Sequence, residues 1–326
     1  MNTKEEKDDF KDRMEKLKIY TMKQDILGDK LFDFEVSDEN NEIYITKYYD
    51  KPERKEVVIP SFVDGIKYRN ANDNDRDEDE DISFRLIGIF FGCKYLEKVR
   101  MGPNVKGDLA VLFCGFKGDK LDLSDFDTSN ITNMDSMFEW CYAKHIHLGN
   151  KFNTSKVESM KFMFCSSKIR KLELPEYFNT RNVENMEGMF YCCSAEEINL
   201  GKAFYTSNVR DMSRMFSYIK LEKLELGDNF DTSKIHKLEV IAGECDNEYL
   251  NLGNRIYVHS TNMSHMFAYS VFNQINLGNN FHINNDNDDI FFRCAVDKII
   301  LGHNSSQKTI EYIRRNITDA VVEINT

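Results

Sequence analysis

A pair of leucine-type residues separated by one polar residue recurs along most of this chain. The pairs are Leu121/Leu123, Ile146/Leu148, Leu172/Leu174, Ile198/Leu200, Leu224/Leu226, Leu250/Leu252, Ile275/Leu277 and Ile299/Leu301, at intervals of about 24 to 26 residues. A fixed period of this length is typical of repeat proteins, in which each unit packs mainly on its neighbours. The period therefore determines the fold class before any single element is assigned.

Each pair is followed by a second half with its own spacing. An aromatic residue (Phe126, Phe152, Phe178, Phe204, Phe230) precedes a polar turn, and then comes Met-x-x-Met-Phe, as in Met134/Met137/Phe138 and Met160/Met163/Phe164. The leucine pair alternates with a period of two, which predicts a strand, whereas the methionines have the i, i+3 spacing of a helix. Each repeat is therefore expected to hold a short strand, a turn, and a helical turn or short helix.

Stacking explains why these residue types recur. A single unit cannot bury its Leu, Phe and Met faces alone, but stacked copies bury them against each other, at about 1.5 to 3 kcal/mol for each large apolar side chain. The polar turn, for example Asp127-Thr128-Ser129-Asn130, offers side chains that bond the backbone where it leaves the strand. The Leu, Phe and Met rows are therefore expected to form the core.

The run from Phe126 to Phe138, ending in Cys141, resembles the repeat of BspA-like leucine-rich-repeat proteins, the mycoplasma-lipoprotein type. The segments Val57–Pro60, Val63–Ile66 and Ile87–Val99 resemble the entry repeats of that family. The resemblance implies an α/β repeat: a right-handed solenoid with a parallel sheet on its concave face, short helices or turns on the convex side, and a binding function.

The sequence divides into four parts. Residues 1–50 are expected to form a cap, with a helix within residues 4–27 and a hairpin built from Leu31–Val36 and Ile43–Tyr49. Residues 51–119 hold the entry repeats, with an acidic insertion at 71–81. Residues 120–304 form the solenoid, and residues 305–326 form the second cap, a short helix and a strand. Caps are needed because an uncovered terminal repeat exposes sheet edge and apolar surface.

Two repeats depart from the pattern. Leu238, Ile241 and Ala242 replace Met, Met and Phe, and Asn285 and Asp288 replace apolar residues. We expect the solenoid to bend or loosen there.

The acidic insertion contains Asp73, Asp75, Asp77, Glu78, Asp79, Glu80 and Asp81. Such a like-charged run is usually solvated, and a contact with a basic partner is the alternative. A calcium loop needs a glycine turn, which this run lacks.

The net charge and the lengths of the apolar runs limit the classes of function that are expected for this chain. With 43 Lys and Arg against 55 Asp and Glu, the net charge is −12. This argues against binding to nucleic acid or to an anionic membrane surface. No run approaches the ~18 to 20 apolar residues of a membrane span, and Met1–Asp9 has no signal-peptide character. A cytoplasmic location is expected.

The cysteines and histidines are interpreted as structural or surface residues. Cys93, Cys114, Cys141, Cys165, Cys192, Cys193 and Cys294 follow a phenylalanine by one to three residues, which predicts reduced, mostly buried thiols. Adjacent Cys192 and Cys193 cannot both face the core, so one of them is expected to be the most reactive thiol. His145 and His147 would point the same way on a strand, but no third metal ligand is evident. No metal or cofactor is expected.

No catalytic motif stands out. We find no Gly-rich phosphate loop, no G-x-S-x-G and no H-E-x-x-H, so the chain is expected not to be an enzyme. The methionine rows are read as core rather than as an adaptable groove.

The candidate binding surface consists of the non-core strand positions. They are Lys120, Asp122, His145, His147, Lys171, Glu173, Glu197, Asn199, Lys223, Glu225, Tyr249, Asn251, Gln274 and Asn276. Tyr249 is the predicted anchor, since aromatic residues are enriched at binding hot spots. We expect a protein partner, with a basic surface fitting the charge, and a scaffold that acts as an inhibitor or effector. A surface or adhesive protein and an acidic nucleic-acid mimic are the alternatives.

Overall fold

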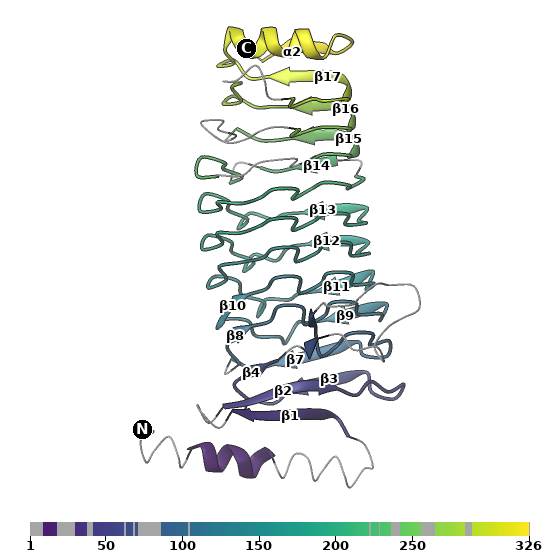
Figure 1. Ribbon diagram of the computed structural model, residues 1–326, viewed down its shortest axis with the longest axis vertical. Coiled ribbons are helices and arrows are strands. Elements are labelled where there is room, and N and C mark those ends of the chain that lie inside the picture. The colour runs from purple at the N-terminus through teal and green to yellow at the C-terminus, as the bar shows by residue number, and fades with distance from the viewer. Residues whose placement is uncertain are drawn as a thin grey trace.

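The chain folds into one column of stacked coils, with its two ends at opposite ends of the column (Figure 1). The computed structural model describes residues 9–17, 30–37, 42–61, 63–67, 69–70, 86–103, 105–221, 223–227, 229–235, 242–254, 256, 265–283 and 289–325. The acidic insertion with Asp73, Asp75, Asp77, Glu78, Asp79, Glu80 and Asp81 lies outside these residues, as do Leu238, Ile241, Asn285 and Asp288. The prediction of a repeat solenoid is confirmed.

One side of the column is a row of parallel strands, which we call the strand face. It consists of β3 (Glu56–Ile59), β7 (Lys98–Met101), β9 (Lys120–Asp122), β11 (His145–His147), β12 (Lys171–Glu173), β13 (Glu197–Asn199), β14 (Lys223–Glu225), β15 (Asp246–Asn251), β16 (Val271–Asn276), β17 (Ala295–Leu301) and β18 (Val321–Ile324). The register places equivalent residues side by side, with Leu121 opposite Ile146 and Leu250 opposite Ile275. The leucine pairs are therefore the inward positions of this row, as their alternation predicted.

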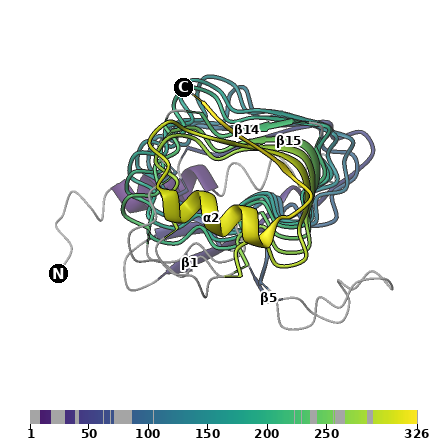
Figure 2. The same ribbon diagram turned by 90° about the horizontal axis from the view of Figure 1, so that it is seen from above.

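A second, shorter parallel row lies elsewhere around the coil. β8 (Gly107–Asp108) pairs with β10 (Ile131–Asn133), and single parallel bridges continue the row from Asn133 through Ser159 and Asn185 to Asp211. β4 (Gly65–Ile66) pairs in parallel with β2 (Glu42–Tyr48), and β5 (Arg69–Asn70) pairs antiparallel with β6 (Leu86–Ile87). Viewed from above, each coil closes around a common interior (Figure 2).

The Met-x-x-Met-Phe segments are turns, so the short-helix part of the prediction is wrong there. Each turn contains two residues four positions apart with left-handed backbone, for example Phe162 (φ 54°) with Ser166 (φ 53°), and Arg214 (φ 59°) with Tyr218 (φ 60°). A left-handed residue interrupts a right-handed helix. We call these positions the left-handed corner residues. They turn the chain while keeping the methionines and phenylalanines on the inside.

A matched pair of arginines tests the left-handed corners. Arg214→Gly is expected to stabilise the protein by about 1 kcal/mol, because glycine adopts positive φ without the steric penalty of a side chain. Arg210 is exposed in the same coil and is not among the positive-φ residues, so Arg210→Gly is expected to destabilise it by a similar amount. Urea unfolding of both variants measures the difference, and a loss of stability in both would contradict the assignment of a left-handed corner.

Two columns of stacked phenylalanines run through the interior. Phe90, Phe113, Phe138, Phe164, Phe190 and Phe216 lie with successive ring centroids 5.1 to 5.6 Å apart and ring planes within 11° of parallel. Phe126, Phe152 and Phe178 form the second column, at 6.5 and 6.2 Å. The inward leucines and most of the methionines are also fully buried. The core rows predicted from the repeat are confirmed.

The polar turns hold successive coils together. The hydroxyls of Thr128, Thr154, Thr180 and Thr206 are buried, and each donates a hydrogen bond to a backbone carbonyl of the next coil at 2.6 to 3.0 Å. Within a turn, the side chain of Asp127 accepts the backbone N–H of Ser129 at 2.9 Å. These bonds satisfy polar groups that would otherwise be buried without partners.

Helices and strands cover both ends of the column. At the amino-terminal end, residues 9–17 are helical, and β1 (Phe32–Ser37) pairs antiparallel with β2 (Glu42–Tyr48). At the other end, α2 (Gln307–Asn316) begins at Ser306, whose hydroxyl accepts the N–H of Thr309, and it buries Ile310 and Ile313. Among the described residues, no helix has the length and apolar character needed to cross a membrane.

Candidate functional site

The fourteen strand-face positions picked out from the sequence all have solvent-accessible side chains on one side of the column. The exposed positions are Lys120, His145, His147, Lys171, Glu173, Glu197, Asn199, Lys223 and Glu225, and the partly exposed ones are Asp122, Tyr249, Asn251, Gln274 and Asn276. They form two lines across the strands, since His145 lies opposite Lys120 and His147 opposite Asp122. Each line brings together residues that are about one repeat apart in the sequence.

The strand face is hollowed between β3 and β13. The hollow has a volume of about 1050 Å³, and β9, β11 and β12 contribute the middle of its lining. The strand row is interrupted twice: β3, β7, β9 and β11 form one sheet, β12 and β13 a second, and β14 to β18 a third. The first interruption, between β11 and β12, lies within the hollow. The hollow therefore lies where the regular stacking of strands changes.

Pro175 distinguishes the coil of β12, which borders the first interruption, from the neighbouring coils. The equivalent residue after the leucine pair is Gly149, Gly201, Gly227, Gly253 or Gly278 in other coils, with φ between 69° and 73°. Proline is held near φ −65° and has no backbone N–H. In the next coil, the side chain of Asn199 accepts the N–H of Gly201 at 3.0 Å, a bond that Pro175 cannot make. The coil of β12 therefore leaves its strand along a different path from its neighbours.

The floor of the hollow is apolar and its walls are charged. Ile146, Leu148, Leu174 and Pro175 line it together with the two histidines. Ile146 is only partly buried, unlike the equivalent inward residues of the other coils, Leu121, Leu172 and Ile198. Ile146 and Pro175 are the partly exposed apolar residues of the floor, whereas Leu148 and Leu174 are buried beneath the surface. Apolar residues within a polar rim are the usual anatomy of a binding surface.

Ion pairs neutralise most of the charge on the walls. Glu97 lies 2.7 Å from Lys120 and 3.1 Å from Lys55, and these contacts lower the pKa of the Glu97 carboxyl, with that from Lys120 the larger. Lys171 lies 2.9 Å from Glu173 and 3.2 Å from Glu197, which raises the pKa of the Lys171 amine. Exposed pairs of this kind contribute little to stability.

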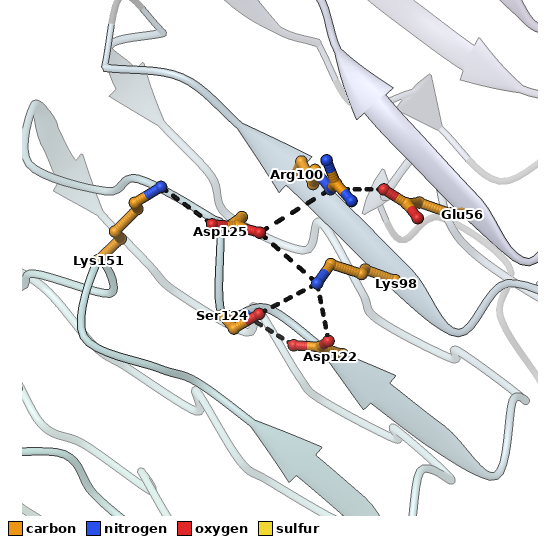
Figure 3. A network of polar contacts seen from close by, with 7 residues as sticks. All are labelled: Glu56, Lys98, Arg100, Asp122, Ser124, Asp125 and Lys151. Atoms are coloured by element: carbon orange, nitrogen blue, oxygen red, sulfur yellow. Dashed lines mark hydrogen bonds and ion pairs between the residues drawn. The ribbon is translucent and has the colours of Figure 1, made fainter.

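A denser polar network borders the hollow on the side of β7 (Figure 3). It joins Glu56, Lys98, Arg100, Asp122, Ser124, Asp125 and Lys151. Lys98 lies 3.1 Å from Asp122 and 3.5 Å from Asp125, and the contact with Asp122 is the main cause of the raised pKa of the Lys98 amine. The network therefore joins four successive coils, those of β3, β7, β9 and β11, along this edge of the hollow.

The two histidines form a pair of imidazoles on either side of Ile146. Both are exposed, and both line the hollow. Across the described part of the chain, no group of three or more His, Cys, Asp or Glu side chains is placed to hold a metal ion. In the hollow, these imidazoles can donate or accept hydrogen bonds to a bound molecule.

Tyr249, the anchor predicted from the sequence, lies outside the hollow. It is partly exposed on β15, and the Lys223 amine lies 5.7 Å from the centre of its ring. The strand-face positions from Lys223 to Asn276 therefore form a separate polar ladder above the hollow.

The cysteines lie in the interior or at its edge. Burial raises the pKa of the Cys141 thiol to about 12 and that of Cys193 to about 11. Cys193 is buried, whereas Cys192 has φ 53° and is partly exposed. Only one of these two adjacent residues therefore faces the core, as the sequence predicts. Burial also raises the pKa of Cys192. The raised pKa values of Cys141, Cys192 and Cys193 disfavour the thiolate, which is the nucleophilic form of cysteine.

The sequence contained a signal for the hollow that the repeat analysis did not use. Pro175 follows Leu174, where the later repeats have glycine. Its position marks the coil at which the strand row is interrupted.

One comparison with known proteins identifies a related group. A family model described as "Mycoplasma protein of unknown function, DUF285" matches residues 107–226 and 198–296. The two overlapping stretches together span residues 107–296, more than half of the 326 residues. No curated protein and no solved structure matches the chain. The matched region holds the regular coils and part of the hollow's lining, from Lys120 to Asn199.

Proposed function

We propose that this chain, which belongs to the DUF285 family of Mycoplasma proteins of unknown function, is a non-catalytic scaffold that binds a protein partner at the hollow of the strand face. The observation that carries the proposal is the hollow itself, with its apolar floor and ion-paired walls at the interruption of the strand row. The family match also supports the mycoplasma-type repeat that the Phe126–Cys141 run resembles.

The chemistry of the hollow fits a protein better than a polyanion. Ile146 and Pro175 offer an apolar contact, and the surrounding lysines already have carboxylate partners. Nucleic-acid binding depends on cations that are free to replace counterions around phosphates, and the net charge of −12 opposes such a ligand. A protein segment that places an apolar side chain on the floor and polar groups on the walls satisfies both parts of the surface.

Binding rather than catalysis is the proposed role of these groups. The Glu97 carboxyl has a lowered pKa and the Lys171 amine a raised pKa, both moved away from neutral pH. General acid–base catalysis works best with a group whose pKa lies near the operating pH. A scaffold of this kind acts by covering a surface of its partner, as an inhibitor or effector does.

Affinity capture with paired variants tests the proposal. The wild-type chain, the double variant His145→Glu/His147→Glu and the control His303→Glu are immobilised and exposed to lysate of the cells that make the protein. His303 is also exposed but lies beyond β17, away from the hollow. We expect wild type and control to retain the same protein, and the double variant to retain about ten-fold less. Equal retention by the double variant, with an unchanged thermal melt, would exclude the hollow as the binding site.

A further inference from the structure

Four exposed large apolar side chains gather on the later coils of the column. Tyr218 is 45% exposed, Tyr269 49%, Val271 51% and Phe292 37%. Tyr269 and Phe292 lie on successive coils with ring centroids 5.4 Å apart, and Val271 follows Tyr269 by two residues. Single exposed apolar residues are ordinary on protein surfaces, but a contiguous group marks an interaction site.

The backbone presents these side chains outward. Tyr218 (φ 60°), Tyr269 (φ 59°) and Arg293 (φ 53°) are left-handed corner residues. The residues around them, such as Phe216, Phe267 and Phe291, supply the apolar side chains of the core. The aromatic rings at the corner are therefore not needed to fill the interior, although Tyr218 and Tyr269 have a backbone conformation that is unfavourable for a residue with a side chain.

Arg293 adds a cation to this group. Its guanidinium lies 5.4 Å from the ring centre of Phe292 and 5.8 Å from that of Tyr269. Within the part of the chain that the structure describes, no carboxylate lies within ion-pair distance of Arg293. Lys120 and Lys171 of the hollow, in contrast, each have a carboxylate partner. A guanidinium held on aromatic rings without a counter-charge is prepared for a carboxylate from outside.

We propose that Tyr269, Val271, Phe292 and Arg293 form a second docking surface, which binds a protein segment presenting a large apolar side chain beside a carboxylate. Tyrosine and arginine are the residues enriched at the energetic centre of protein interfaces. The ligand is expected to carry a carboxylate because it would pair with Arg293. It is expected to carry a large apolar side chain because that side chain would pack on the exposed rings. This inference is independent of the proposed function, because it rests on different coils and different residues from the hollow.

Aromatic rings beside an arginine can also stack nucleic-acid bases. The observations favour a protein, because such binding relies on a positively charged groove that follows the backbone. The cation of this corner is Arg293, Glu244 accepts a hydrogen bond from the Tyr218 hydroxyl beside it, and the chain carries a net charge of −12. Single-stranded DNA is therefore a test outcome rather than the expected ligand.

Selection from a displayed library of random peptides, about 12 residues long, tests the docking surface on the immobilised full chain. We expect enriched peptides to carry Asp or Glu close to Trp, Phe or Leu. The affinity of the best peptide is expected to fall about ten-fold or more with Arg293→Glu or with Phe292→Ser, and to a similar extent when its carboxylate is replaced by an amide. The matched control is Arg181→Glu, since Arg181 also lies over a tyrosine ring, 4.1 Å from the centre of Tyr205, and is expected to leave binding unchanged.

Three results would overturn the proposal. The first is the absence of any enriched peptide whose binding depends on Arg293. The second is binding of oligo(dT) that Arg293→Glu abolishes, which would assign the corner to single-stranded nucleic acid. The third is a concentration-dependent dimer, seen by sedimentation, that the same variant dissociates, which would assign the corner to a second copy of the chain. None of these results bears on capture through the hollow, so the two proposals fail separately.

Discussion

Phe164→Ala is expected to lower the free energy of unfolding by about 3 to 5 kcal/mol, the range for removing a fully buried phenylalanine. Phe164 is 0% exposed and lies between Phe138 and Phe190, with ring centroids 5.3 and 5.6 Å away. The loss should be large because neighbouring coils cannot close the gap without losing register along both parallel rows. Urea unfolding followed by circular dichroism measures it.

The control for this variant is Tyr177→Ala, which removes an aromatic ring that is 52% exposed. Its effect is expected to remain within about 0.5 kcal/mol, as for most surface substitutions. Because each coil contacts mainly its neighbours, Phe164→Ala should also broaden the unfolding transition by weakening the middle of the column. A loss below about 1 kcal/mol for Phe164→Ala would show that the stacked column does not stabilise the fold.

Gly278→Ala is expected to destabilise the protein by several kcal/mol, and Gly227→Ala by only about 1 to 2 kcal/mol. Both glycines follow a leucine pair, with φ 70° and 73°, so the two variants suffer the same left-handed penalty. They differ in their surroundings: a Cβ on Gly278 would overlap the carbonyl oxygen of Gly253 in the preceding coil, whereas a Cβ on Gly227 would meet nothing within 4 Å.

The difference in destabilisation between these two variants measures the cost of placing a Cβ where the coils approach closely at Gly278. Thermal melts of both proteins measure it, with the wild type as reference. Equal destabilisation by the two substitutions would mean that the coils do not approach at Gly278 as closely as the structure shows.

The repeat and its core could be predicted from the sequence because the apolar rows carry the period directly. Leu121 and Ile146 lie in register, Phe138 and Phe164 stack, and Cys193 is buried. Each of these follows from the need of one unit to bury its apolar residues against the next. The period of the apolar residues was sufficient for this, without knowledge of the backbone path.

The shape of the corners could not be predicted from the same rows. Met160 and Met163 have helical spacing, but a turn with left-handed residues at Phe162 and Ser166 buries the same side chains. Glycine occupies the equivalent position at Gly188, which is a weak sign of positive φ. Bulky residues at the other corners conceal it, because residues such as Phe162 rarely adopt this conformation.

The candidate surfaces could be predicted only in part. The alternation of the strands gave the outward positions, including His145 and His147, but their grouping around a hollow depends on the interruption beside Pro175. The aromatic corner at Tyr269 depends on the backbone conformation of its turn, which the sequence analysis had assigned to a helix. The two candidate surfaces therefore depend on local backbone geometry, which the period of the apolar residues does not encode.

Amide hydrogen exchange of the full chain, alone and with its captured partner, tests most directly whether the hollow is the binding site. We expect binding to slow exchange at residues 145–149 and 171–175, which lie on either side of the interruption in the strand row. Residues 131–135, on the second parallel row, are expected to exchange at the same rate in both states. Slower exchange confined to other parts of the column, with 145–149 and 171–175 unchanged, would contradict the proposed role of the hollow.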